Sequence, residues 1–349
     1  VKSGDNMKFF TKHNYLILII LLIVFISGCQ DHNNTEQINN SNHKKTENKQ
    51  IIQKVENYNY SRMKSQINNL KKEYNNLQVS TIGKSYQNRK LFLVKMGRGD
   101  KKIAVIGGFH GREGLTSLLT LRILEDYLKN EDINNYNITS LFNKTSLYFI
   151  PMLNPDGVNI AVNGISDLEN QEFYLNANEG KKDFSRWKAN ARGVDLNKQF
   201  KADWNNVKSK HKPHFESYKG PSPESEPESK ALADLTRKEE FDAVVCFHHS
   251  GRIIYWYYNQ SGKQLKRDYN LVKALSKINQ YEAVSRSDSD TTAAGYKDWV
   301  IKEFNNRGFT IEIGYKDKVE KPLSSAKLDK YFDENRCVLL ELAHRLNER

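Results

Sequence analysis

Hydrophobic residues recur along most of this chain with two periods, and the two periods alternate. Apolar residues at helical spacing predict amphipathic helices over 58–77, 113–129, 224–237, 263–279, 297–306 and 327–346. Short apolar runs bounded by polar turns predict strands over 79–83, 90–96, 103–107, 146–152, 242–247, 253–258 and 309–313. The polar stretch 163–190 is expected to be a surface loop. Strands alternating with helices predict an α/β fold, a three-layer sandwich with a central mixed sheet flanked by helices.

The N-terminal part has a different pattern. A basic start leads into an unbroken apolar run, 16–26, which is shorter than the roughly 20 residues of a membrane-spanning helix and fits a secretory signal. The run ends in ISGC, which resembles the lipobox of bacterial lipoproteins, whose cysteine (here Cys29) is acylated and becomes the mature N-terminus. The alternative is an uncleaved anchor with an incidental cysteine. Either way, we expect an exported, membrane-anchored protein on the outer face of a bacterial cytoplasmic membrane.

These patterns divide the chain into three parts. Residues 1–29 are expected to be the lipoprotein-type signal peptide. Residues 30–56 are rich in Asn, Lys and Gln and are expected to form a disordered linker. Residues 57–349 are long enough for one large folded domain.

Charge and cysteine content narrow the function classes. The net charge of +12 favours anionic surroundings, although a Lys- and Asn-biased composition explains it equally well. Basic residues interleaved with aromatic ones form no stripe, which argues against nucleic acid as a partner. Three cysteines are too few for a disulfide framework.

Candidate metal ligands follow the predicted strands. His110 and Glu113 lie three residues apart where the strand over 103–107 gives way to a helix. An imidazole and a carboxylate so placed can bind one Zn²⁺, and His248, at the end of another apolar run, can supply a third protein ligand. Two nitrogens and a carboxylate, with one position left for water, make the open arrangement of a hydrolytic zinc site.

Six segments in this order, FHGREG, MLNPDGV, RWKANARGVDLNKQF, FHHSGRIIYW, AAGYKDW and GFTIEIG, resemble the zinc metallocarboxypeptidases over about residues 58–346. The resemblance implies a zinc carboxypeptidase-like catalytic domain with one Zn²⁺ per chain. WKANARGVDLN together with HSG and IIYW is most similar to the branch that cleaves peptidoglycan stem peptides, the γ-D-glutamyl-diaminopimelate peptidases.

The resemblance also implies roles for single residues. His110, Glu113 and His248 would bind zinc, with His249 as the alternative to His248. Glu312 would be the general base that acts on water and passes its proton to the leaving amine. A buried structural carboxylate is the alternative for Glu312.

Four further residues have implied roles. Arg192 would stabilise the oxyanion, or would be a loop arginine in salt contact with a neighbouring aspartate. Asn197 and Lys198 would hold a substrate carboxylate. Lys297 would set the preference for the side chain after the scissile bond, or would face water. The family usually has arginine where this chain has Lys198, so carboxylate binding is expected to be weaker or different.

We therefore expect a lipid-anchored zinc peptidase that hydrolyses peptidoglycan stem peptides, between γ-D-glutamate and diaminopimelate. The alternatives are a carboxypeptidase that removes C-terminal residues from ordinary peptides and a non-catalytic, wall-binding lipoprotein. The expected partners are stem peptides or another peptide substrate and, through the lipid, the membrane.

Overall fold

The computed structural model describes residues 50–249, 251–285, 294–315 and 322–348. Cys29 lies outside these residues, as does the segment 1–49. Among the helices that are described, none is both long enough and apolar enough to span a membrane.

An eight-stranded mixed sheet forms the centre of the fold. Its strands are β1 (Gln78–Lys84), β2 (Lys90–Gly97), β3 (Lys101–Ile106), β6 (Thr145–Ile150), β7 (Ala243–His249), β8 (Ile253–Tyr255), β9 (Glu282–Ala283) and β10 (Arg307–Ile313). They are arranged in the order β1-β2-β6-β3-β7-β10-β8-β9. The central strands β6, β3, β7 and β10 are parallel, whereas the pairs β1–β2, β2–β6 and β8–β10 are antiparallel. A separate small hairpin joins β4 (Asp132–Ile133) to β5 (Tyr136–Asn137).

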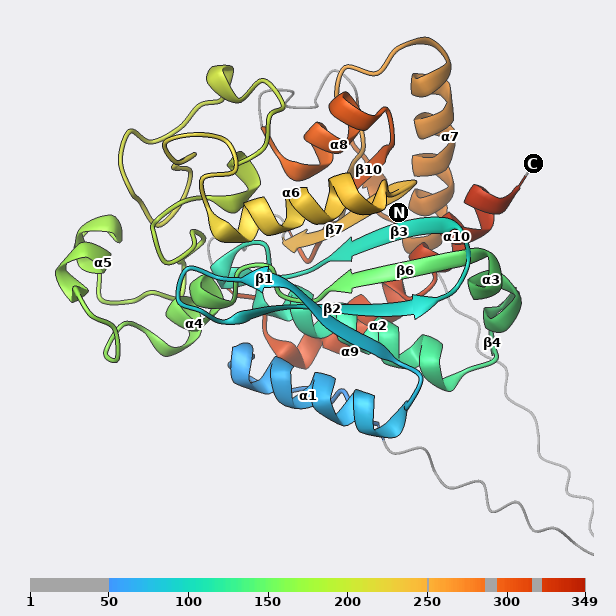
Figure 1. Ribbon diagram of the computed structural model, residues 1–349, viewed down its shortest axis with the longest axis horizontal. Helices are drawn as coiled ribbons and strands as arrows, with labels where there is room; N and C mark the ends of the chain where they lie inside the picture. The colour runs from blue at the N-terminus through green and yellow to red at the C-terminus, as the bar shows by residue number, and fades with distance from the viewer. Residues whose placement is uncertain (1–49, 250, 286–293, 316–321, 349) are drawn as a thin grey trace, which may run out of the picture. The chain divides into compact units, whose positions relative to one another are not determined.

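Helices cover both faces of this sheet. They are α1 (Tyr60–Glu73), α2 (Gly114–Lys129), α3 (Ile138–Lys144), α4 (Pro155–Asn163), α5 (Gln171–Ala177), α6 (Pro227–Glu239), α7 (Gly262–Asn279), α8 (Tyr296–Phe304), α9 (Leu328–Asn335) and α10 (Val338–Asn347). Residues of α6 and α8 share a buried cluster with one face of the sheet. Residues of α1, α2, α3, α7, α9 and α10 share a larger cluster with the other face. Figure 1 shows α6 and α8 on one side of the sheet and α1, α2 and α9 on the other. The predicted three-layer α/β sandwich is confirmed.

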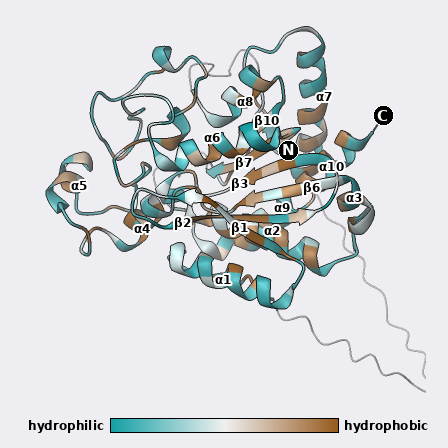
Figure 2. Ribbon diagram, viewed as in Figure 1, coloured by the Kyte–Doolittle hydropathy of each residue, from teal (hydrophilic) through white to brown (hydrophobic). Residues whose placement is uncertain are grey.

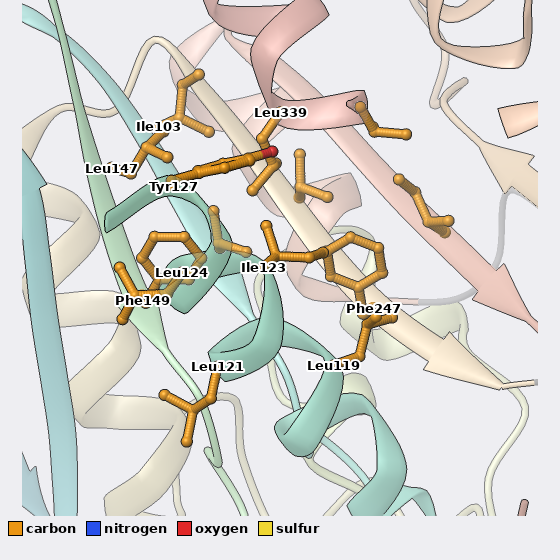
Figure 3. Packing of buried hydrophobic residues seen from close by; sticks show 14 of the residues in the cluster. Ile103, Leu119, Leu121, Ile123, Leu124, Tyr127, Leu147, Phe149, Phe247 and Leu339 are labelled. Carbon is orange, nitrogen blue, oxygen red and sulfur yellow. The ribbon is translucent and has the colours of Figure 1, made fainter. Parts of the chain in front are cut away.

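Alternation along the strands produces the two cores. In β3, Ile103 and Val105 belong to the larger cluster, whereas Ala104 and Ile106 belong to the smaller one. Such strands are apolar on both faces because helices cover both, and Figure 2 shows β3, β6 and β7 as mostly hydrophobic. Figure 3 shows side chains of α2 packed among those of the neighbouring strands, with Leu119 beside Phe247 of β7. This packing fixes α2, whose first turn follows the candidate metal ligands.

Several elements differ from the sequence-based expectation. The helix predicted over 327–346 is two helices, α9 and α10, separated at Arg336 and Cys337. The predicted loop 163–190 contains the short helix α5. Helix α4 was not among the predicted helices; Asn154 caps it by accepting a hydrogen bond from the Gly157 N–H, and Pro155 occupies its first turn.

The predicted linker also ends earlier than residue 56. Ile52 is fully buried in the larger core. The N–H groups of Ile51 and Ile52 donate to the two carboxylate oxygens of Glu125 on α2, at 2.5 and 3.0 Å. Residues 50–56 therefore belong to the folded body. The polar composition of this segment did not indicate that it is folded, because its packing depends on only two isoleucines and on main-chain hydrogen bonds.

Candidate metal centre

The loop after β3 presents the first two candidate ligands. Gly108 has a φ of +56°, and a Cβ at that position would lie 2.4 Å from the Ser117 hydroxyl. A side chain at Gly111 would meet two backbone carbonyls at 2.5 and 2.6 Å. Glycine at both positions allows the loop to turn back over α2. As a result His110, in extended conformation, is followed at once by a 3₁₀ turn that ends at Glu113.

His110, Glu113 and His248 converge on one buried point. Oε1 of Glu113 lies 2.6 Å from Nδ1 of His110, and its Oε2 lies 3.0 Å from Nδ1 of His248. The two Nδ1 atoms are 3.1 Å apart, and the ligand atoms of the three side chains all lie within 4.8 Å of one another. Nitrogen lone pairs this close repel each other unless a proton or a metal cation lies between them. Two imidazoles and one carboxylate are donors that zinc prefers, so the residues present fit a Zn²⁺ ion.

Charge within the cluster also fits a cation. Burial would raise the pKa of Glu113, but His110 and His248 outweigh burial and hold that pKa well below its usual range. Burial lowers the pKa of His110, whereas at His248 burial is outweighed by the attraction of the Glu113 carboxylate, which raises the pKa. An ionised carboxylate and an imidazole that resists protonation are the states in which these groups bind metal.

The register of the sheet places Glu312 beside the cluster. Glu312 of β10 is paired with His248 of β7 in the parallel ladder, and adjacent strands lie about 4.8 Å apart. Its Oε2 is buried and has no hydrogen-bond partner among the described residues. Burial, the largest effect, raises the pKa of Glu312 to about 7. An unpaired carboxylate with a pKa near neutrality has the properties of a general base.

The structure distinguishes between the two adjacent histidines. His248 lies on the same face of β7 as the smaller core, where its ring stacks on that of Phe109 at 5.2 Å between centroids. His249 is the next residue along the strand and therefore points to the opposite face. Only His248 contributes to the metal cluster.

Sequence reasoning missed two residues, Asp195 and Lys188. Oδ1 of Asp195 lies 3.2 Å from Nε2 of His110, and its Oδ2 lies 3.2 Å from Nζ of Lys188. A carboxylate at Nε2 favours the tautomer that leaves Nδ1 free for metal. Burial opposes the charges of both groups, but the attraction between them prevails, so the pKa of Asp195 is well below its usual range and that of Lys188 is raised. Both therefore stay charged beside the metal cluster. Both residues belong to the motif RWKANARGVD. The signal that the sequence offered for them was a charged residue of this motif close to the tryptophan.

Arg192 does not take the predicted position. Its guanidinium lies over the ring of Tyr86, 5.5 Å from the centroid, and 3.8 Å from Oε1 of Glu226. The side chain is 44% exposed and lines a groove that contains none of the three candidate ligands. The cation that interacts with the cluster from this loop is Lys188. The loop turns back on itself around Arg192, where the Asn190 N–H donates to the Val194 carbonyl and the Gly193 N–H donates to the Asn190 carbonyl.

The last three predicted site residues are near Asp195 in different ways. Asn197 and Lys198 follow it along the chain, and Lys297 belongs to α8. Oδ1 of Asn197 accepts a hydrogen bond from the Tyr296 N–H at the start of α8, and Lys198 lies close enough to lower the pKa of Asp195. Lys297 is buried, forms an ion pair with Asp298 and donates to the carbonyl of Tyr257 at 3.0 Å. Lys297 therefore does not face water, and α8 brings it near Asn197. Whether these three contact substrate stays a prediction.

Comparison with known proteins agrees with this geometry. Residues 63–336 match the family described as zinc carboxypeptidase. The chain is 35% identical over 291 residues to gamma-D-glutamyl-L-diamino acid endopeptidase 1 of Lysinibacillus sphaericus, covering 81% of this chain and 72% of that protein. It is 26% identical over 250 residues to human carboxypeptidase B, covering 67% and 57% of the two chains.

Solved structures share the fold. The crystal structure of thrombin activatable fibrinolysis inhibitor superposes with a TM-score of 0.68 at 21% identity, covering 86% of this chain and 78% of that one. Carboxypeptidase A from Helicoverpa armigera superposes with a TM-score of 0.62 at 18% identity, covering 85% and 74%. Because the family match spans most of the described body and includes the buried metal cluster, the chain belongs to the zinc carboxypeptidase family and is a zinc metallopeptidase.

Proposed function

We propose that this peptidase hydrolyses the amide bond between γ-D-glutamate and a diamino acid in peptidoglycan stem peptides. The observation that carries the substrate class is the similarity, over 81% of the chain, to an endopeptidase named for γ-D-glutamyl-L-diamino acid bonds. The position of Glu312 beside the zinc ligands supports hydrolysis.

His110, Glu113 and His248 would hold the zinc ion, which would supply a Lewis acid that polarises the scissile carbonyl and activates water. Glu312 accepts the proton of the attacking water and passes it to the leaving amine, because its Oε2 has no hydrogen-bond partner among the described residues. Asp195 keeps His110 in the required tautomer through Nε2.

Lys188 takes the role that the motif suggested for Arg192. As a charged ammonium held by Asp195, it stabilises the negative charge that develops on the carbonyl oxygen. Asn197 and Lys198 follow Asp195 directly in η2 (Leu196–Lys198) and bind a carboxylate on the leaving-group side. Lys297 binds an acidic group of the diamino acid side chain.

The experiment is mass spectrometry of defined stem peptides after incubation with the purified protein. The expected result is release of the peptide that begins with the diamino acid, and loss of this activity with a chelator. Glu312→Gln is expected to lower kcat by about 10²–10⁴-fold with unchanged zinc content. Glu303→Gln, on the exposed face of α8, is the matched control. Near-normal turnover by Glu312→Gln would refute the mechanism.

Amidation of the substrate's C-terminal carboxylate separates two modes of action. An endopeptidase retains activity on the amidated peptide, whereas an enzyme restricted to C-terminal residues loses it. Loss of activity together with release of single C-terminal residues from ordinary peptides would replace our proposal with a carboxypeptidase. Inert, zinc-free protein would instead favour a non-catalytic wall-binding role.

We also propose that the protein is exported and anchored to the outer face of the membrane through a lipid on Cys29. The support is the ISGC sequence that ends the apolar run. The test is fractionation of cells that express the wild type and Cys29→Ser: the wild type is expected in the membrane fraction, and the variant outside it or unprocessed. Equal fractionation and equal processed mass would refute lipidation.

A further inference from the structure

A groove of about 760 Å³ lies outside the metal cluster. It lies between the turn that joins β1 to β2, the residues around α5 and the loop 190–194. Tyr86, Phe173, Tyr174 and Tyr218 supply its aromatic lining, and we call it the Tyr86 groove. Tyr86 is 54% exposed, the largest value among the described large hydrophobic residues that are exposed. The guanidinium of Arg192 lies over this ring, 5.5 Å from its centroid, and the rest of the ring is open to a ligand.

The turn that carries Tyr86 is held by buried carboxylates. The Tyr86 N–H donates to Oε1 of Glu228 at 3.0 Å, and the Gln87 N–H donates to Oδ2 of Asp156 at 2.8 Å. Both carboxylates are fully buried, and the Ser85 hydroxyl also donates to Asp156. Burying carboxylates is costly unless they have partners, and here several of those partners are the backbone and side chains of one surface turn. The turn is thus fixed in place before any ligand binds.

The opposite wall of the groove is fixed to the same network. Oδ1 of Asn190 accepts hydrogen bonds from the N–H groups of Arg192 and Val194, at 2.9 and 3.0 Å. Its Nδ2 donates to Glu226 at 2.8 Å and to Glu228 at 3.3 Å. Glu228 therefore connects the loop of Arg192 to the turn of Tyr86. A rigid pair of walls lowers the cost of ordering the site when a ligand binds.

The Tyr86 groove lies close to the metal centre along the chain. Arg192, in the groove, is three residues before Asp195, which contacts His110. Three residues span at most about 11 Å. In Figure 1, α5 lies at the end of the molecule toward which β3 and β6 point, and the candidate metal ligands follow β3 at that end. One extended substrate can therefore occupy both places.

The chemistry of the lining indicates what binds there. Beside the aromatic rings, the groove has planar polar side chains: the guanidinium of Arg192, the carboxamide of Gln87 and the carboxylates of Asp167 and Glu169. Aromatic faces pack against the C–H faces of sugar rings, and planar polar groups pair with their hydroxyl and acetamido edges. Two carboxylates against one guanidinium disfavour nucleic acid and an anionic membrane surface.

We propose that the Tyr86 groove binds the glycan to which the stem peptide is attached, a chain of N-acetylated hexose rings. The inference rests on the proposed function, because a glycan-linked peptide is the substrate that would place sugar rings beside the metal centre. Tyr86 packs against a ring face, and Arg192 donates two parallel hydrogen bonds to the ring's polar edge. The groove thereby raises the local concentration of stem peptides on intact wall glycan.

Two measurements test this. The first compares kcat/KM on a free stem peptide and on the same peptide attached to glycan chains. We expect the wild type to favour the glycan-linked form by about tenfold and Tyr86→Ala to lose most of that preference, with the free peptide cleaved at the wild-type rate. Arg192→Lys is also expected to lose preference because an ammonium cannot make the planar two-pronged contact. Tyr269→Ala removes an exposed tyrosine of α7 and is the control, which is expected to keep the preference for the glycan-linked peptide.

The second measurement is a titration of peptide-free glycan chains into the wild type and the same variants, and it does not depend on catalysis. Binding by the wild type and Tyr269→Ala, weakened about tenfold in Tyr86→Ala, supports the groove. No glycan binding, equal binding by all four proteins, or equal kcat/KM on the two substrates overturns it. If neither substrate is cleaved but glycan binding follows the Tyr86 variants, the proposed function fails and the glycan site stands.

Discussion

Oδ1 of Asp195 lies 3.2 Å from Nε2 of His110, whose other ring nitrogen, Nδ1, lies 2.6 Å from Oε1 of Glu113. The Asp195 carboxylate also holds the ammonium of Lys188 at 3.2 Å. One buried aspartate thus contacts both a candidate metal ligand and a cation that lies beside the candidate metal cluster. The relationship explains why Asp195 is kept ionised although it is completely buried.

Asp195→Asn is therefore expected to weaken zinc binding by about 10–100-fold, because an amide no longer enforces the His110 tautomer as a carboxylate does. Competition with a chromogenic chelator at constant pH measures the change. Asp203→Asn, which removes a surface partner of Lys302, is the control and should bind zinc as the wild type does. Unchanged zinc affinity in Asp195→Asn would show that the contact has no effect on the metal.

Substitutions of Lys188 and of Arg192 are expected to have different effects on kcat. Lys188→Met is expected to lower kcat on a free stem peptide by about 10²–10³-fold, as loss of an oxyanion donor does, with little change in KM. Arg192→Met is expected to stay within about twofold of the wild type, because its guanidinium lies over Tyr86. Steady-state kinetics on one short substrate compares the two. The reverse order of effects would return the oxyanion role to Arg192.

Much of the site could be predicted because its ligands follow a local rule. His110 and Glu113 are three residues apart, and His248 and Glu312 each lie near the end of an apolar strand. Parallel strands bring such ends to one edge of the sheet, so residues from three distant segments could be placed together without coordinates. The α/β architecture followed from the same alternation of strands and helices.

The rest depends on contacts that no local pattern encodes. Lys188 and Arg192 belong to one motif, but Lys188 pairs with Asp195 whereas the guanidinium of Arg192 lies over Tyr86. The burial of Ile52 depends on Glu125, more than seventy positions away. The break between α9 and α10 coincides with Arg336, whose guanidinium pairs with Asp126 of α2 at 2.8 Å. Tertiary partners therefore decided the details that sequence periodicity left open.

Deleting the chain up to residue 56 is expected to destabilise the folded body. The deletion removes Ile52 from the core, which costs about 2–5 kcal/mol by analogy with large-to-small substitutions, and it removes two backbone donors from the buried Glu125. Urea unfolding compares this protein with a control shortened only up to residue 49. The single substitution Ile52→Ala should reproduce much of the loss. Equal stability of the two truncated proteins would place residues 50–56 in the linker after all.

The shifted pKa of Glu228 predicts a pH dependence of the free energy of unfolding. Burial, with the nearby Asp156 adding to it, raises the pKa of Glu228 from 4.5 to about 7. The folded state therefore holds this proton more tightly than the unfolded state does. The stabilising contribution is complete below pH 4.5 and is lost as pH rises through about 7. A shift of this size corresponds to about 3 kcal/mol.

We expect Glu228→Gln to flatten the pH dependence of the free energy of unfolding between pH 5 and 8. At pH 5 the variant should be less stable than the wild type. The glutamine oxygen can accept a hydrogen bond from only one of the two donors, Tyr86 N–H and Asn190 Nδ2, and the glutamine NH₂ group would then face the other donor. The difference should shrink at pH 8, where the wild type carries a buried charge. Urea unfolding of zinc-free protein at both pH values measures it, with the exposed Glu240→Gln as control. Parallel pH profiles for wild type and Glu228→Gln would mean that Glu228 stays ionised throughout, and the fixed walls of the Tyr86 groove would then depend on a buried charge.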